Sequence, residues 1–223
     1  MRRVSLSAAA VALGLLLTAC GSDEKEQPRV TAAQQCDGTL SPAAAKALES
    51  VLRAEKFLEA DSGGLKRTVD QLIEDQAREG RPPGHPAMCE VTTDQGLEMR
   101  VEFRLYERDD LYDDGRDWTT SGRHLYALGR EASSDNETAR LFVGCTSPRL
   151  KGSSERPAPI QGLLRFDKPL KGALPDNTPA TREAYLTVLH SVTLAVVKEL
   201  GCENNAGLPE RPVLTEKKWR GER

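Results

Sequence analysis

Residues 97–105 carry the clearest pattern in the chain, because apolar and charged side chains alternate there without a break. This period of two predicts a strand with one face in a core and one face in solvent. Residues 89–92 are joined to it by turn-forming residues, which favours an antiparallel hairpin. Shorter apolar runs at residues 124–128, 140–145 and 161–167 predict further strands. We therefore expect an antiparallel sheet of about five strands.

Three other segments have the spacing of amphipathic or buried helices. Residues 41–59 begin at Ser41 and Pro42, a capping residue followed by one suited to the first turn, and residues 65–80 repeat the spacing. Residues 178–200 are apolar over most of a helix circumference, which predicts a long helix deep against the sheet. The predicted fold class is α+β, with two N-terminal helices and one long C-terminal helix covering one face of the sheet.

Residues 1–19 have the organisation of an export signal. A short cationic start is followed by an apolar run at residues 4–17 and by the small residues Thr18 and Ala19. The run is shorter than the roughly 20 residues needed to span a bilayer, and polar residues follow it. We expect a signal peptidase to remove this segment rather than leave it in the membrane.

Cys20 stands directly after Leu17, Thr18 and Ala19. This tetrapeptide resembles the lipobox of bacterial lipoproteins, in which the cysteine thiol is diacylglycerylated and the cysteine becomes the mature N-terminus. The resemblance implies that Cys20 carries lipid and anchors the protein to the cell membrane on its extracytoplasmic face. Acyl chains buried together anchor stably, because each buried CH₂ contributes about 0.8 kcal/mol. An ordinary secretory signal with an incidental cysteine is the alternative.

Three regions follow the signal segment. Residues 20–35 lack apolar periodicity and predict a flexible tether. Residues 36–207 hold all the predicted helices and strands, and they are numerous enough for a single α+β domain with a sizeable core. Residues 208–223 contain two prolines and a charged end, so we expect a disordered tail.

Four cysteines remain once Cys20 is assigned to lipid, and an even number in an exported protein predicts two disulfides. They are Cys36, Cys89, Cys145 and Cys202. Four cysteines allow three pairings, among which sequence alone cannot choose. Placement favours Cys36 with Cys89 and Cys145 with Cys202, because each pair would join the end of a helical region to a strand. No two of them have the close spacing of a metal site or a redox motif, so we expect no metal.

The composition excludes some functions and leaves others open. Loss of Arg2 and Arg3 with the signal takes the formal charge from −3 to −5, and without a basic face we expect no nucleic-acid partner. Signature motifs of hydrolases, zinc proteases and nucleotide-binding loops are absent, so no catalytic residue or cofactor is assigned. An envelope hydrolase built on His124 or His190 is an alternative, although we expect His190 on a partly exposed polar face.

Residues 107–117 are rich in aspartate around Gly115. Clustered carboxylates can bind calcium, but the EF-hand pattern fails, because Tyr112 replaces an Asp or Asn and Ser121 replaces the bidentate Glu. We therefore expect an exposed loop without a metal. Tyr112 and Trp118 stand beside its acidic groups and are the best surface candidates for binding a partner.

The order of features along the chain is a lipobox, a tether, a cysteine that opens an amphipathic helix, a cysteine that leads a hairpin, and a closing helix. This layout resembles small actinobacterial cell-envelope lipoproteins of unassigned role. The resemblance implies helices packed on an antiparallel sheet. We expect a membrane-anchored, non-enzymatic binding or interaction module, with an envelope protein or a small molecule as its ligand. A lipid or small-molecule carrier, with a cavity between helices and sheet, is a further alternative.

Overall fold

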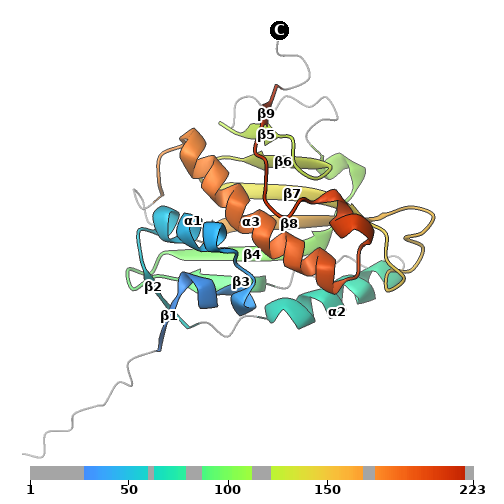
Figure 1. The fold of residues 1–223 in the computed structure, drawn as a ribbon, viewed down its shortest axis with the longest axis horizontal. Coiled ribbons are helices and arrows are strands. Elements are labelled where there is room, and N and C mark those ends of the chain that lie inside the picture. Colours follow the sequence, from blue (N-terminus) through green and yellow to red (C-terminus); the bar gives the residue numbers. More distant parts are fainter. Residues whose placement is uncertain (1–27, 60–62, 79–86, 112–121, 168–173, 219–223) are drawn as a thin grey trace, which may run out of the picture.

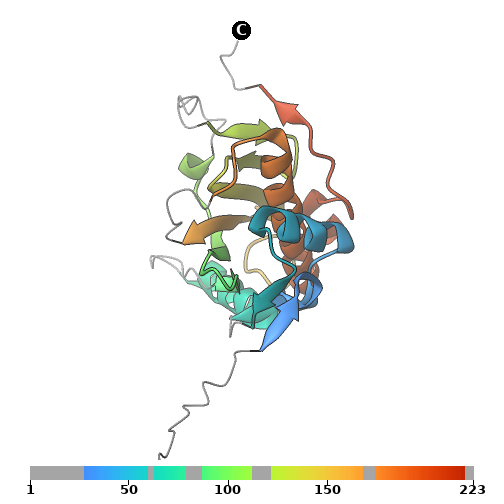
Figure 2. The ribbon, with the colours of Figure 1, turned by 90° about the vertical axis from the view of Figure 1, so that its left-hand side faces the viewer.

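The computed structural model describes residues 28–59, 63–78, 87–111, 122–167 and 174–218. They form an antiparallel sheet of nine strands in the order β1-β2-β3-β4-β8-β7-β6-β5-β9. Three α-helices lie on one side of this sheet (Figures 1 and 2). The predicted α+β class is confirmed, whereas the predicted number of about five strands is wrong.

The longest strands lie in the middle of the sheet and the shortest at its edges. In chain order they are β1 (Arg29–Thr31), β2 (Lys56–Leu58), β3 (Ala87–Thr92), β4 (Glu98–Leu105), β5 (His124–Tyr126), β6 (Glu131–Ser134), β7 (Thr138–Cys145), β8 (Ala158–Asp167) and β9 (Glu216–Lys217). The predicted strands correspond to β3, β4, β5, β7 and β8. The others have two to four residues each, too few for a period of two to be recognised.

Helix starts follow the predicted capping chemistry. The helices are α1 (Pro42–Leu52), α2 (Gly64–Ala77) and α3 (Pro179–Glu199). The hydroxyl groups of Ser41 and Thr178 each accept a backbone hydrogen bond from the first turn of α1 and α3, respectively, and a proline follows each of them. These caps satisfy N–H groups that have no partner within the helix.

The placement of α1 differs from the prediction. Arg53 adopts a left-handed φ of 50°, which ends the helix at Leu52 rather than near Glu59. The chain then enters β2, where Phe57 is fully buried. α1 packs chiefly against α3, whereas α3 covers β6, β7 and β8, and α2 covers β3 and β4 (Figure 1). The expected layer of three helices directly on the sheet is therefore wrong for α1.

α3 meets the middle of the sheet at Gly162 of β8. A β-carbon added at Gly162 would lie 3.0 Å from the Thr193 hydroxyl and 3.1 Å from a Leu189 methyl group. Such distances are shorter than ordinary van der Waals contact, so glycine lets the helix and the strand approach closely. The apolar side chains around this point are buried in one continuous core. The space between α3 and the central strands is therefore filled.

Both favoured disulfides are confirmed. Cys36 is bonded to Cys89 and Cys145 to Cys202, across sequence separations of 53 and 57 residues. The first joins the short 3₁₀ segment before α1 to β3, and the second joins the end of β7 to the third residue after α3. Loops of this length stabilise a fold by about 4 kcal/mol each when entropy of the unfolded chain dominates.

Ordered structure extends past the predicted domain at both ends. β1 lies within the segment expected to be a tether. Residues 208–218, expected to be disordered, begin with buried Leu208 and end in β9, which pairs with β5. Apolar burial and strand pairing together hold this segment in place. None of the helices in the described ranges is long and apolar enough to cross a membrane.

Candidate functional site

Three residues singled out from the sequence lie outside the described residues: Cys20, Tyr112 and Trp118. Their assignment to lipid attachment and partner binding stays a prediction. The four cysteines predicted to form disulfides do lie in the described ranges and are all paired. The remaining candidates for a site among the described residues are His124, His190, the charged face of the sheet and the surface pockets.

His190 is buried rather than partly exposed, so the sequence expectation is wrong. Its side chain lies beneath the segment after α3, and its Nε2 is 2.9 Å from the Pro209 carbonyl oxygen. Burial lowers the pKa of His190. A neutral imidazole that donates to a backbone carbonyl accounts for these observations as part of the core.

His124 has a carboxylate partner but no available nucleophile. Its Nδ1 lies 2.5 Å from a carboxylate oxygen of Glu216. Ser134 is opposite His124 in the β5–β6 pair, but it is buried and its hydroxyl is bonded to backbone carbonyls at 3.3 and 3.4 Å. A hydrolase would need a hydroxyl or thiol placed against the histidine. This arrangement gives the hydrolase alternative little support.

The face of the sheet opposite the helices carries a network of paired charges, which we call the face network: Glu90, Glu98, Arg100, Glu102, Arg165 and Asp167. The terminal nitrogens of Arg100 lie 2.9–3.7 Å from four carboxylates. Hydrogen bonds to Glu102 at 3.1 and 3.2 Å raise the pKa of Arg165. Ion pairs thus cross from β4 to both β3 and β8, and these side chains are partly buried rather than fully exposed to solvent.

A different group of arginines lines a pocket of about 380 Å³ at one end of the sheet. We call it the arginine pocket, and its lining residues are Gln76, Tyr106, Arg108, Leu111, Arg130, Arg156, Pro157 and Pro159. They come from the end of α2, the segment after β4, the turn before β6 and the start of β8. Loops that meet on a rigid sheet are common positions for binding residues.

Backbone contacts fix the wall that carries Tyr106 and Arg130. Tyr106 N donates to the Pro159 carbonyl at 2.9 Å, and Arg130 N donates to the Phe142 carbonyl at 2.8 Å. Gly129 has a φ of +58°, and a β-carbon added there would lie 2.7 Å from the Phe142 carbonyl oxygen. Only glycine fits this turn without strain, so Gly129 determines where Arg130 leaves the backbone.

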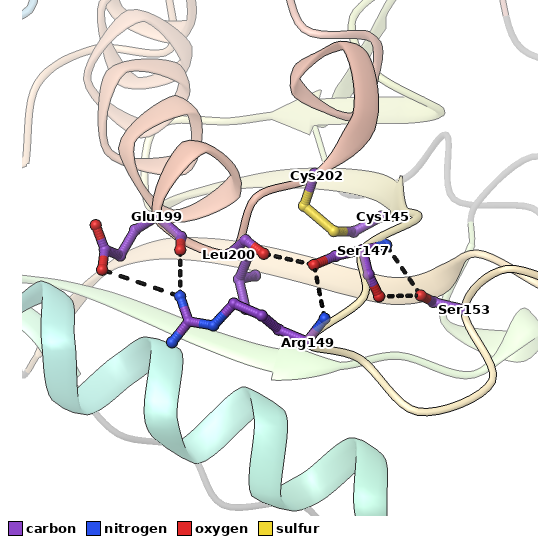
Figure 3. Close-up of a disulfide and its surroundings, with 7 residues drawn as sticks. All are labelled: Cys145, Ser147, Arg149, Ser153, Glu199, Leu200 and Cys202. Atoms are coloured by element: carbon purple, nitrogen blue, oxygen red, sulfur yellow. Dashed lines mark hydrogen bonds and ion pairs between the residues drawn. A yellow bond between two sulfur atoms is a disulfide. The ribbon is translucent and has the colours of Figure 1, made fainter.

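The loop between β7 and β8 brings Arg156 to the pocket. Figure 3 shows that this loop is fastened beside the Cys145–Cys202 disulfide. There Ser147 and Arg149 donate hydrogen bonds to backbone carbonyl groups at the end of α3 (Figure 3). Further along, Arg156 N donates to the Gly152 carbonyl at 3.2 Å. The disulfide and these hydrogen bonds together restrain the loop that supplies Arg156.

The arginine pocket has an excess of positive charge. In the part of the chain that the structure describes, no carboxylate lies within ion-pair distance of Arg108, Arg130 or Arg156. The acidic neighbours in sequence, Asp109, Glu131 and Glu155, do not line the pocket. Arg130 donates to the Tyr106 hydroxyl at 3.4 Å. Burial raises the pKa of Tyr106, so its phenol stays protonated at neutral pH.

Sequence reasoning missed this pocket because its arginines are far apart in the chain. Positions 108, 130 and 156 share no motif, and only the strand order β4-β8-β7-β6 brings their loops to one end of the sheet. The one local signal is the pair Gly129-Arg130, which is typical of a tight turn that presents a charged side chain.

Among the described residues, no group of three or more His, Cys, Asp or Glu side chains is placed to hold a metal ion. The comparisons add no family to this picture. No protein-family model matches the chain, and no match was found among curated proteins or solved structures.

Proposed function

We propose that the protein is a lipid-anchored, extracytoplasmic binding module of the cell envelope and has no catalytic role. The observation that carries the proposal is the tetrapeptide Leu17-Thr18-Ala19-Cys20 after a short apolar run. The pairing of Cys36 with Cys89 and of Cys145 with Cys202 supports it. Disulfides are typical of exported proteins, and this pairing leaves Cys20 as the single cysteine outside a disulfide.

The described residues favour binding over the alternatives. The core between α3 and the sheet is filled at Gly162, which argues against a carrier that holds a lipid there. Among the described residues, His124 and His190 lack an available nucleophile, which argues against a hydrolase built on either of them. A restrained pocket whose arginines meet no carboxylate of the described residues suits a module that holds a ligand without transforming it.

The anchor is tested by Cys20→Ala in the bacterial host, with Ser22→Ala as the matched control. We expect the parent and Ser22→Ala proteins to fractionate with membranes and to carry the additional mass of acyl chains in intact mass spectrometry. Cys20→Ala should be released, or retained only as a precursor without acyl mass. Acyl mass on the Cys20→Ala protein would overturn the proposal.

A further inference from the structure

We propose that the arginine pocket binds a phosphate group, coordinated by Arg108, Arg130 and Arg156. The inference deepens the proposed function, because it names the chemical class of the ligand that the module holds. Three guanidinium groups line a pocket of about 380 Å³ and have no carboxylate partner among the described residues. An anion in the pocket would remove the repulsion among them.

The chemistry of arginine favours an oxyanion with several acceptor oxygens. A guanidinium is planar, is always charged and presents five N–H donors that match phosphate oxygens in pairs. Three such groups supply more charge than a single carboxylate can neutralise, whereas a phosphate monoester or inorganic phosphate carries up to two negative charges. The pocket composition therefore fits a phosphate group better than a peptide carboxylate.

Tyr106 adds a neutral donor to the three charged ones. Its oxygen accepts from Arg130 at 3.4 Å, so its own proton remains available to an anion. Burial raises the pKa of Tyr106 and keeps that proton in place at neutral pH. Its ring packs edge-on against Phe142 with the centroids 5.1 Å apart, which fixes the direction of the hydroxyl.

The walls of the pocket are held before any ligand arrives. Tyr106 and Pro159 are joined by a backbone hydrogen bond, Arg130 leaves a turn fixed by Gly129, and Arg156 follows a loop fastened near a disulfide. Such preorganisation reduces the ordering that binding requires. The structure thus combines charge, donors and a restrained backbone in one place.

The experiment is a calorimetric titration of the purified full-length protein, in detergent and at constant ionic strength, with inorganic phosphate. The test variant is Arg108→Gln/Arg130→Gln/Arg156→Gln. The control variant is Lys46→Gln/Arg67→Gln/Arg211→Gln, which removes three positive charges from exposed positions elsewhere. A hydrogen bond to a charged group contributes roughly tenfold in affinity. We expect the pocket variant to bind at least about 30-fold more weakly and the control to change by less than about twofold.

Two further titrations identify the source of the phosphate group. Glycerol 3-phosphate represents a free monoester, and glycerophosphoglycerol represents the diester of a lipid headgroup. Saturable binding of either that is lost in the pocket variant supports the proposal and names the source. No saturable binding of any of the three compounds, or equal losses in the pocket and control variants, would overturn it.

Phosphate binding in the arginine pocket and lipid attachment at Cys20 can be disproved independently. Phosphate binding in detergent does not depend on acylation, and the pocket variant should still fractionate with membranes. Circular dichroism of the pocket variant distinguishes loss of binding from loss of fold. We expect its spectrum to match that of the parent, because the three arginines have no ion-pair partners among the described residues.

Discussion

Two sets of arginines on one sheet differ in what surrounds them. In the face network, Arg100 and Arg165 lie among carboxylates of β3, β4 and β8. In the arginine pocket, Arg108, Arg130 and Arg156 come from loops and meet no carboxylate of the described residues. Arginine therefore links strands through ion pairs in the face network. In the arginine pocket it has no acidic partner among the described residues.

The difference shows why counting charges says little about function. In the face network two arginines face four carboxylates of β3, β4 and β8, so every arginine has acidic partners and the network keeps a negative excess. In the arginine pocket, by contrast, no carboxylate of the described residues lies within ion-pair distance of an arginine. A mildly acidic protein can thus contain a local site for an anion, because the potential near a pocket depends on nearby groups more than on net charge.

The largest effect should come from breaking the disulfide beside the pocket loop. Cys145→Ser/Cys202→Ser should lower the free energy of unfolding by about 4 kcal/mol in urea denaturation, because the unfolded chain gains freedom. The same change should weaken phosphate binding, since the loop that carries Arg156 loses its fastening. The control Cys36→Ser/Cys89→Ser should cost similar stability and spare the pocket. Equal loss of phosphate affinity in both variants would contradict the assignment of the loop.

An intermediate effect should separate the two sets of arginines directly. Glu102→Gln leaves Arg165 and Arg100 short of a partner in a half-buried position and should cost about 1–3 kcal/mol in urea denaturation. Arg130→Gln, which breaks no ion pair among the described residues, should change stability by less than about 0.5 kcal/mol. A larger loss for Arg130→Gln than for Glu102→Gln would show that the comparison is wrong.

The smallest effect concerns Tyr106 and pH. Its folded-state pKa is raised above the usual 10 by burial, so the fold favours the neutral phenol. This contribution to stability is complete below about pH 10 and is lost as pH rises through the folded-state pKa. Phosphate affinity should therefore hold up to about pH 10 and fall above it. Tyr106→Phe should reduce affinity by about threefold. It should also remove one tyrosine's share of the late tyrosinate absorbance, because burial also raises the pKa values of Tyr126 and Tyr185. An affinity that declines well before the phenol ionises would argue against its role as a donor.

Much of the fold follows from local pattern. β4 and α3 could be predicted from the spacing of their apolar residues. These residues recur with the period of a strand in β4 and lie around most of a helix circumference in α3. β6 was not among the predicted strands, since the Ser133-Ser134 pair has turn chemistry yet is buried between β5 and β7. Whether a short segment forms a strand depends on the strands that pair with it, and a single sequence does not show that pairing.

The candidate site depended even more on tertiary structure. His190 was expected at a surface because its helix was considered without the segment that returns over it through Pro209. The three arginines of the pocket belong to different loops, and their proximity is a property of strand order. The starts of α1 and α3 could be predicted because a capping residue acts on its own helix turn. The presence of two disulfides could be predicted because an even number of cysteines remains after Cys20.

The two edges of the sheet affect how readily molecules of this protein pair with one another. β1 has three residues preceded by Pro28, and β9 has two residues, both of them charged. Long apolar edge strands invite pairing between molecules, whereas short edges with proline or charge resist it. A protein anchored at Cys20 would be crowded in two dimensions, where such pairing is easiest. The brevity of both edges therefore protects a population of these molecules from aggregation.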